Sequence, residues 1–169
     1  ARGGSRLLAA LLVFSAAGCG FELRGTGSAA LPAELAAMRV IGPGGLAYPP
    51  LLVEVRNALR AQAGVRLVEE AGVPTLTLLE ESTESLVLAT DSSGRVSDYL
   101  LNYRVSFVLT DGAGKELLPR QSIKLQREYS FDRLNVLAKE KEDEFLRREM
   151  RRDAVQQLLR RLAAPPAGR

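Results

Sequence analysis

The stretch "LNYRVSFVLTDGAG", residues 101–114, has the clearest secondary-structure pattern in the chain. Apolar side chains at every odd position from 101 to 109 alternate with mostly polar ones. Because successive side chains of a strand point to opposite faces, this predicts a strand with one buried face and one largely polar face. The turn Asp111–Gly114 predicts a hairpin, so the strand around Gln121–Tyr129 should return antiparallel. Pro119 removes a ladder hydrogen bond, which places the start of that strand at an edge or a bulge.

Two further segments have the character of strands. Leu76 and Leu78 alternate with threonines, and Leu86 and Leu88 resume the pattern before the turn "DSSG" at residues 91–94. A shorter strand is expected at Met38–Ile41, where the turn "GPGG" ends it. The chain therefore offers four strands.

Apolar residues at helical spacing predict two helices. The first covers Pro49–Ala63, with prolines at its start and Gly64 beyond its end. The second runs from about Leu137 to Ala163 and carries an apolar stripe amid dense charge. The stripe consists of Phe145, Leu146, Met150, Ala154, Val155, Leu158, Leu159 and Leu162. The simplest packing lays both helices on the apolar face of one sheet, which gives an α+β fold built as a two-layer sandwich.

Composition limits the chemistry open to this chain. With 169 residues, of which 46% are hydrophobic and 25% charged, it has the balance of a single globular domain. The net charge of +3 comes from basic residues interspersed with acidic ones, which gives little support for a nucleic-acid partner. No His and one Cys exclude His-containing triads, Cys–His pairs and His/Cys zinc sites.

Carboxylates are the remaining candidates for catalysis. Glu80, Glu81, Glu84 and Asp91 could in principle supply an acid/base pair. They lie in a polar stretch, and Asp and Glu are mostly exposed, so we favour a solvated surface. We therefore expect no catalytic residue, no metal site, no cofactor and no enzymatic activity.

The N-terminal segment has the order of a secretory signal. Two arginines precede the apolar run Leu7–Ala17, which is shorter than the about 20 residues of a membrane span. The small residues Ala17 and Gly18 then lead to Cys19, an order that resembles a bacterial lipobox. The resemblance implies cleavage before Cys19 and lipidation of its thiol and amine, although Ala16 stands where leucine is usual. An ordinary signal peptide or a buried helix with an incidental cysteine is the alternative.

These patterns divide the chain into four parts. Residues 1–18 are expected to be a lipoprotein signal peptide, and residues 19–34 a lipidated cysteine with a tether rich in Gly, Ser and Ala. Residues 35–164 would form one α+β domain, and residues 165–169 a short tail. Within the lipobox resemblance, Phe21 stands where the usual inner-membrane retention signal has Asp, which points to the outer membrane.

Nearly the whole chain resembles the LPS-assembly lipoprotein LptE family. The resemblance rests on "CGFELRG" at residues 19–25, on the strands joined by "DSSG" and "DGAG", and on "VLAKEKEDEFLRREMRRDAVQQLLRRL" at residues 136–162. It implies two helices against a mixed, four-stranded sheet. It also implies a periplasm-facing outer-membrane lipoprotein that plugs the LptD β-barrel, helps that barrel assemble and assists delivery of lipopolysaccharide (LPS) to the cell surface. A polar sheet face suits a polar barrel lumen.

The same resemblance suggests cations that contact LPS. One is Lys139, in the "LAK" segment, for which a solvated position in the first helical turn is the simpler interpretation. The other should lie at the turn of residues 91–94, but Ser92 occupies that place, so we take Arg95 as its substitute. Arg104, Lys124 and Arg127 are further basic strand positions, for which solvated or barrel-contacting side chains are the simpler interpretation.

One alternative function stays open. The chain could be a periplasm-facing carrier lipoprotein that binds a lipid or glycan without a barrel. Such a carrier would need an apolar groove between a helix and the sheet.

Overall fold

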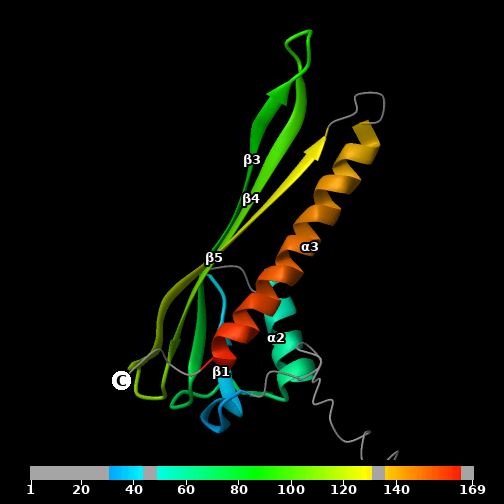
Figure 1. Cartoon of the computed structure of the whole chain (residues 1–169). Coiled ribbons are helices and arrows are strands. Elements are labelled where there is room, and N and C mark those ends of the chain that lie inside the picture. Colours follow the sequence, from blue (N-terminus) through cyan, green and yellow to red (C-terminus); the bar gives the residue numbers. More distant parts are fainter. Residues whose placement is uncertain (1–30, 44–48, 131–135, 165–169) are drawn as a thin grey trace, which may run out of the picture.

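The chain forms a mixed sheet with two helices, and the computed structural model describes residues 31–43, 49–130 and 136–164 (Figure 1). A short 3-10 turn, η2, precedes the first strand. In chain order the elements are η2 Ala33–Leu35, β1 Ala37–Ile41, α2 Pro50–Ala63, β2 Arg66–Leu67, β3 Thr75–Thr90, β4 Val96–Thr110, β5 Glu116–Ser130 and α3 Val136–Ala163. The strand order is β2-β1-β3-β4-β5. β1 pairs in parallel with β2 and β3, whereas β3, β4 and β5 form an antiparallel meander.

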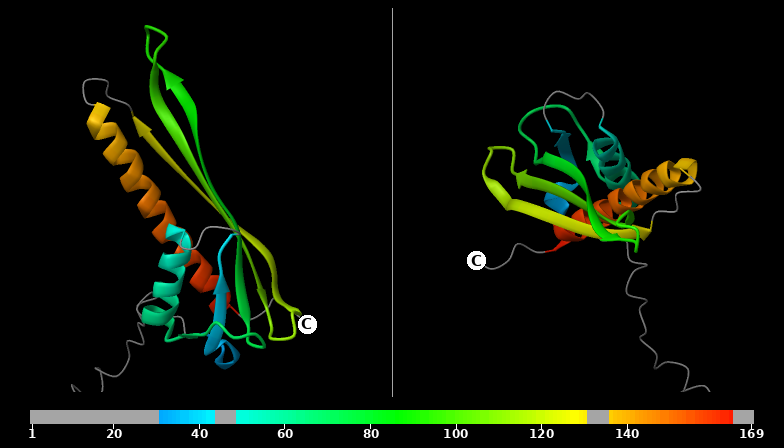
Figure 2. Two further views of the ribbon diagram at one scale, coloured as in Figure 1. Left: turned by 180° about the vertical axis from the view of Figure 1, so that it is seen from behind. Right: turned by 90° about the horizontal axis from the view of Figure 1, so that it is seen from above.

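The predicted α+β class is confirmed, with both helices on one face of the sheet (Figure 2). The predicted number of four strands is wrong, because the sheet has a fifth strand, β2. Gly64 caps α2 in the left-handed region, with φ of 65°, and turns the chain back beside β1. There Arg66 N–H donates to Ala36 O at 2.9 Å. Two residues are too few to show an alternating pattern, so β2 has no signature in the sequence.

The edge position of Pro119 is confirmed. β5 is the last strand of the sheet, and the β4–β5 register shifts at this proline. Phe107 pairs with Gln121, but Leu109 pairs with Leu118, so Pro119 and Arg120 form a bulge. A missing N–H costs no ladder hydrogen bond at such a place.

One apolar core lies between the sheet and the helices. The odd-numbered face of residues 101–109 is buried as predicted, and Met38, Leu76 and Leu78 extend it to the neighbouring strands. From α2 the core takes Leu51, Leu52, Val55, Ala58 and Leu59, and from α3 it takes Met150, Ala154, Val155, Leu158, Leu159 and Leu162. The predicted stripe on α3 is therefore buried only from Met150 onward, whereas Phe145 is 53% exposed.

The molecule is elongated because β3 and β4 extend well past the two-layer core (Figure 1). The β3–β4 turn and the start of α3 lie at one end, which we call the distal end. The β4–β5 turn, η2 and the end of α3 lie at the opposite, proximal end. Among the described residues, no helix has both the length and the apolar character needed to cross a bilayer. The predicted signal peptide, the tether up to residue 30 and the tail fall outside the described ranges.

Candidate functional site

The distal turn presents the candidate cation Arg95. Asp91 Oδ1 accepts hydrogen bonds from the backbone N–H of Ser93 at 2.8 Å and of Arg95 at 3.0 Å. Gly94 adopts φ of 76°, which a side chain rarely allows, so the sequence D-S-S-G-R fixes a tight hairpin turn. The side chain of Arg95 is exposed. Ser92, which stands where the family resemblance places a cation, is also exposed and supplies no charge.

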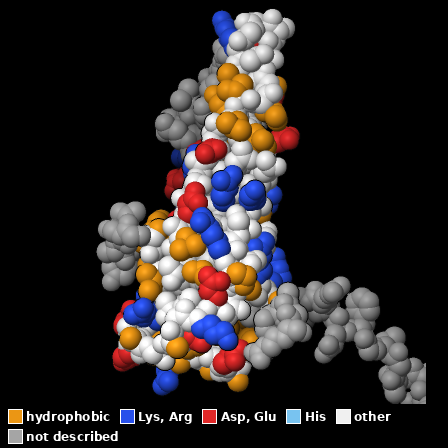
Figure 3. Space-filling view, turned by 90° about the vertical axis from the view of Figure 1, so that its left-hand side faces the viewer, with side chains coloured by type: hydrophobic (Ala, Val, Ile, Leu, Met, Phe, Trp, Pro, Cys, Tyr) orange, Lys and Arg blue, Asp and Glu red, His pale blue; other side chains and the backbone are white. Residues whose placement is uncertain are grey.

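Apolar side chains lie just below this turn. We call Leu86, Val87 and Leu88 the distal apolar surface, and they are 49%, 56% and 48% exposed. A shift in the β3–β4 register between Val87 and Ala89 leaves Leu88 without a direct partner across the ladder. Figure 3 shows apolar side chains gathered toward this end of the sheet. A cation beside exposed apolar side chains suits a ligand that carries both phosphate and acyl groups.

Polar and aromatic contacts stabilise the strands beneath the distal apolar surface. The rings of Tyr99 and Tyr129 stack with centroids 5.4 Å apart. On the adjacent pair, the Ser130 hydroxyl donates to Asp98 Oδ1 at 2.7 Å and the Ser97 hydroxyl to Oδ2 at 2.8 Å. These hydrogen bonds, with that of Ser130 the stronger influence, lower the pKa of the Asp98 carboxyl. The carboxylate therefore stays ionised and joins β4 to β5.

The structure says less about the other two predicted site residues, Lys139 and Cys19. Lys139 lies in the first turn of α3, which begins at the same distal end as Arg95 (Figure 1). Its side chain is outside the described atoms, so its contact with LPS stays a prediction. Cys19 lies outside the described residues, and its lipidation stays a prediction as well.

Arg127 has a structural role. Its guanidinium lies 2.6 Å from the Asp153 carboxylate, and this ion pair joins β5 to α3. Both side chains are close to half exposed, which matches an arginine that shares the face of Ile123 and Leu125 while its charged end reaches solvent. Arg104 and Lys124 point instead to the opposite face of the sheet.

Sequence reasoning missed a polar cluster between the sheet and both helices. Arg151 of α3 contacts Glu81 of β3 and Glu54 of α2, and the Tyr103 hydroxyl donates to Glu81 Oε1 at 2.7 Å. Burial raises the pKa of Tyr103, and the hydrogen bond to Glu81 raises it further. Burial acts to lower the pKa of Arg151, but Glu81 outweighs it and the pKa is raised.

The position of Glu81 depends on a bulge. The β3–β4 register shifts between Leu78 and Glu80, so Leu79 is an extra residue and Glu81 faces the helices. In the sequence, the doublet Leu78–Leu79 interrupts the alternation, and that is the signal that could have revealed the shift. The other candidate carboxylates do not converge: Glu80 pairs with Arg120 at 3.5 Å, and Glu84 is exposed. Within the described ranges, no three His, Cys, Asp or Glu side chains are grouped to hold a metal.

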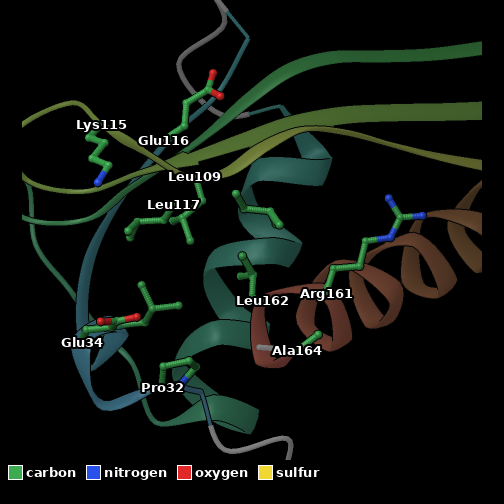
Figure 4. Close-up of a pocket in the computed structure, with 11 residues that line it drawn as sticks. Pro32, Glu34, Leu109, Lys115, Glu116, Leu117, Arg161, Leu162 and Ala164 are labelled. Carbon is green, nitrogen blue, oxygen red and sulfur yellow. The ribbon is translucent and has the colours of Figure 1, made fainter. Parts of the chain in front are cut away.

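The proximal end has a small cavity between η2, the β4–β5 hairpin and the end of α3 (Figure 4). Its volume is about 270 Å³, and Leu35, Leu109, Leu118 and Leu162 line its apolar part. Arg161 lies at its rim and donates to Ser122 O at 3.0 Å. Sites for drug-sized ligands span about 300–1,000 Å³, so this cavity is too small to enclose a lipid with several acyl chains.

The comparisons with known proteins agree on one family. The sequence model described as "LptE: Lipopolysaccharide-assembly" matches residues 37–162. A protein from Photorhabdus laumondii subsp. laumondii named "LPS-assembly lipoprotein LptE" is 33% identical over 160 residues, which cover 92% of this chain and 83% of the relative. A protein of the same name from Yersinia pestis is 34% identical over 161 residues, covering 92% of this chain and 73% of that protein.

Two solved structures have the same fold. An uncharacterized lipoprotein B from Nitrosomonas europaea superposes with a TM-score of 0.71 at 31% identity, and the match covers 86% of this chain and 92% of that one. The rare lipoprotein B from Shewanella oneidensis gives a TM-score of 0.67 at 33% identity, covering 75% of this chain and 93% of the other.

Proposed function

The chain belongs to the LptE lipopolysaccharide-assembly family, and we propose that it is an outer-membrane lipoprotein that plugs the LptD β-barrel. In this proposal it helps the barrel assemble and assists the transport of LPS to the cell surface. It acts by binding, without catalysis. Cys19 carries the lipid anchor and the folded domain faces the periplasm.

The uncovered face of the sheet is the observation that carries the plug. Both helices lie on one face, and no described element covers the other (Figure 2). That outer face presents polar and charged residues from three strands, among them Ser82, Asn102, Arg104 and Lys124. A barrel of this class has a polar interior. A polar sheet face can therefore be enclosed there, because its side chains meet polar groups of the barrel.

The distal end supports a direct contact with LPS. LPS carries phosphates and acyl chains, and this end combines the exposed Arg95 with the distal apolar surface, Leu86–Leu88. Lys139, in the first turn of α3 at the same end, is the second cation of the proposal. An Arg or Lys can pair with a phosphate while the leucines contact acyl chains.

Co-purification from native membranes tests the proposal. Tagged full-length protein is extracted in a mild detergent, and mass spectrometry is applied to its N-terminus and to the co-purifying chains. We expect a triacylated Cys19 and a large β-barrel in near-equimolar amount. An unrelated outer-membrane lipoprotein with the same tag is the matched control and should not bring the barrel along.

Two results would go against parts of the proposal. A lipidated protein that purifies alone would contradict the plug and favour the carrier that works without a barrel. An unmodified cysteine with the barrel still bound would keep the plug and remove the lipid anchor.

A further inference from the structure

The outer face of the sheet holds two cations directly opposite each other. Arg104 of β4 pairs in register with Lys124 of β5, and both side chains are exposed. Like charges at directly opposed positions destabilise a strand pair. An anion bound between them would remove this repulsion.

Neither cation has an ion-pair partner among the described residues. Nearby, Arg120 is already paired with Glu80 at 3.5 Å, and it also donates to Ser106 Oγ at 3.2 Å. The positive charge of Arg104 and Lys124 therefore remains available to a ligand.

The two cations border a shallow depression that also offers neutral donors. Its volume is about 380 Å³, and its lining includes Ser82, Glu84, Asn102 and Gln126. Arg104 of β4 lies between Ser82 of β3 and Lys124 of β5. A hydroxyl and two cations therefore form one row across three strands. In the next row Asn102 Oδ1 accepts from Gln126 Nε2 at 2.7 Å, which leaves the Asn102 amide group as a donor. Glu84 in that row is the one carboxylate on the rim.

This set of groups fits a phosphate better than a carboxylate. A phosphomonoester carries a charge of about −1.5 to −2 near neutral pH and three acceptor oxygens, whereas a protein carboxylate carries one negative charge. Two cations with hydroxyl and amide donors match the larger charge and the larger number of acceptors. The planar guanidinium of Arg104 can bind two phosphate oxygens at once.

An apolar pair continues the same face toward the distal end. Leu86 and Leu100 are in register, and Leu100 lies four residues before Arg104 on β4. At about 3.4 Å per residue, the leucine pair is roughly 14 Å from the cations. Figure 3 shows Lys and Arg side chains midway along this face, with apolar side chains between them and the tip. That spacing suits an amphiphile with a phosphate at one end and acyl chains at the other.

We propose that Arg104 and Lys124 bind the phosphate of an acylated lipid and that Leu86 and Leu100 contact its acyl chains. The phosphate contact is separate from the distal turn with Arg95, whereas Leu86 belongs both to this site and to the distal apolar surface. The lipid's identity as LPS rests on the proposed function, whereas the phosphate contact does not.

A binding measurement on the full-length protein in a non-ionic detergent tests the site. The probes are inorganic phosphate, dihexanoyl phosphatidic acid and, as a zwitterionic control, dihexanoyl phosphatidylcholine. The test variant is R104Q/K124Q, and the charge-matched control is R66Q/K115Q, in which both replaced side chains are exposed and lie outside the depression. We expect phosphatidic acid to bind most tightly, and R104Q/K124Q to weaken it by at least about tenfold while the control does not.

A second readout is independent of the ligand. Without phosphate, R104Q/K124Q should melt at the same temperature as the parent or higher, because a repulsive pair has been removed. A lower melting temperature, or equal phosphatidic acid binding by the two double variants, overturns the site. Equal affinity for inorganic phosphate and phosphatidic acid overturns the lipid assignment.

Co-purification of the barrel is measured separately for the parent protein and for R104Q/K124Q. If R104Q/K124Q loses the co-purifying barrel but keeps its phosphatidic acid affinity, Arg104 and Lys124 contact the barrel protein and not a lipid, and the inference fails. If the parent protein binds phosphatidic acid as expected but purifies without a barrel, only the plug proposal fails.

Discussion

Arg151 Nε lies 3.2 Å from Glu81 Oε1, across the interface between α3 and β3. The two side chains are only 17% and 18% exposed. Arg151 also reaches Glu54 of α2, so one guanidinium connects both helices with the sheet. The pair lies where α3 changes environment, since Met150 is fully buried and Phe145 is half exposed. Arg151 therefore anchors the helix at the border of the core.

Replacing Arg151 by methionine should lower the free energy of unfolding by about 2–3 kcal/mol, because Glu81 would be left as a poorly solvated charge without its cationic partner. Urea denaturation measures the loss. R148M is the matched control: Arg148 forms an exposed pair with Glu144, and its loss should cost under about 0.5 kcal/mol. The double variant E81Q/R151M should recover part of the loss. Equal effects of R151M and R148M would contradict this role for Arg151.

Tyr103 should make stability depend on pH in the alkaline range. Burial raises its pKa above the ordinary 10.0, with a further contribution from Glu81. In the unfolded chain the phenol ionises near the ordinary value, so the unfolded state binds fewer protons than the native state above that pH. The stabilisation is present below pH 10.0 and is lost as the pH rises. The stability advantage of the parent over Y103F should therefore shrink toward about pH 11 in denaturation experiments. A constant difference would contradict the raised pKa.

Gly112 should not tolerate a side chain. A Cβ there would lie 2.2 Å from Gly72 O and 2.5 Å from Gly72 C, so the backbone at Gly72 must shift to relieve the contact. G112A is expected to cost about 1–3 kcal/mol, measured by thermal or urea unfolding. The matched control is S92A, at the equivalent position of the distal turn, where a Ser is already present and exposed; its effect should stay within about 0.5 kcal/mol. An equal cost for both would show that the close approach is unimportant.

Asp98 should titrate below its ordinary pKa of 3.8, because the hydroxyls of Ser130 and Ser97 donate to it. The carboxylate contributes stability above that pH and loses the contribution as the pH falls through its lowered pKa. S130A removes the stronger hydrogen bond and should raise the pKa of Asp98, as followed by carboxyl-carbon NMR. S122A, on the same strand but remote in register, should leave it unchanged. No shift in S130A would contradict the assignment.

Cys19→Ala should release the protein from membranes and leave the domain folded. The reason is that the anchor and the domain are predicted to be separate parts, joined by the tether. Membrane fractionation with circular dichroism of the released protein measures both effects. C19S is a second variant without the thioether and should behave in the same way. A variant that stays on the membrane would contradict lipidation as the anchor, and an unfolded one would contradict the predicted domain boundary.

Local patterns predicted most of the fold. The alternation over residues 101–109 is a short-range property, and every odd-numbered position in it is buried as expected. The alternation does not reveal where two strands begin, since β4 begins at Val96 and β5 at Glu116, close to their turns. Side chains near the turns are only partly buried there, so the sequence carries little alternation. Both hairpin turns, at residues 91–94 and 111–114, are predictable from the sequence because Asp and Gly have fixed places in them.

The contacts that depend on distant partners were not predictable in this way. Glu81 and Arg151 are 70 residues apart and each lies in a charged segment that resembles a solvated surface. Only the bulge at Leu79 and the path of α3 bring them together. For the residues proposed to contact LPS, the sequence resemblance points to the cations, and the structure adds that Arg95 is exposed at the distal turn.

The parallel pairing of β1 also determines the order in which the chain can fold. β3, β4 and β5 join through short turns, whereas β1 must find β3 across the whole α2 segment, with Arg39 opposite Thr75. Contacts between sequence neighbours form faster than contacts across a long connection. A chain that emerges with its N-terminus first therefore carries a β1 strand whose edge toward β3 is unpaired, with Met38 and Val40 not yet covered by the sheet, until β3 has followed. During synthesis, the interval before β3 has followed is therefore the one in which a holding chaperone would help this chain most.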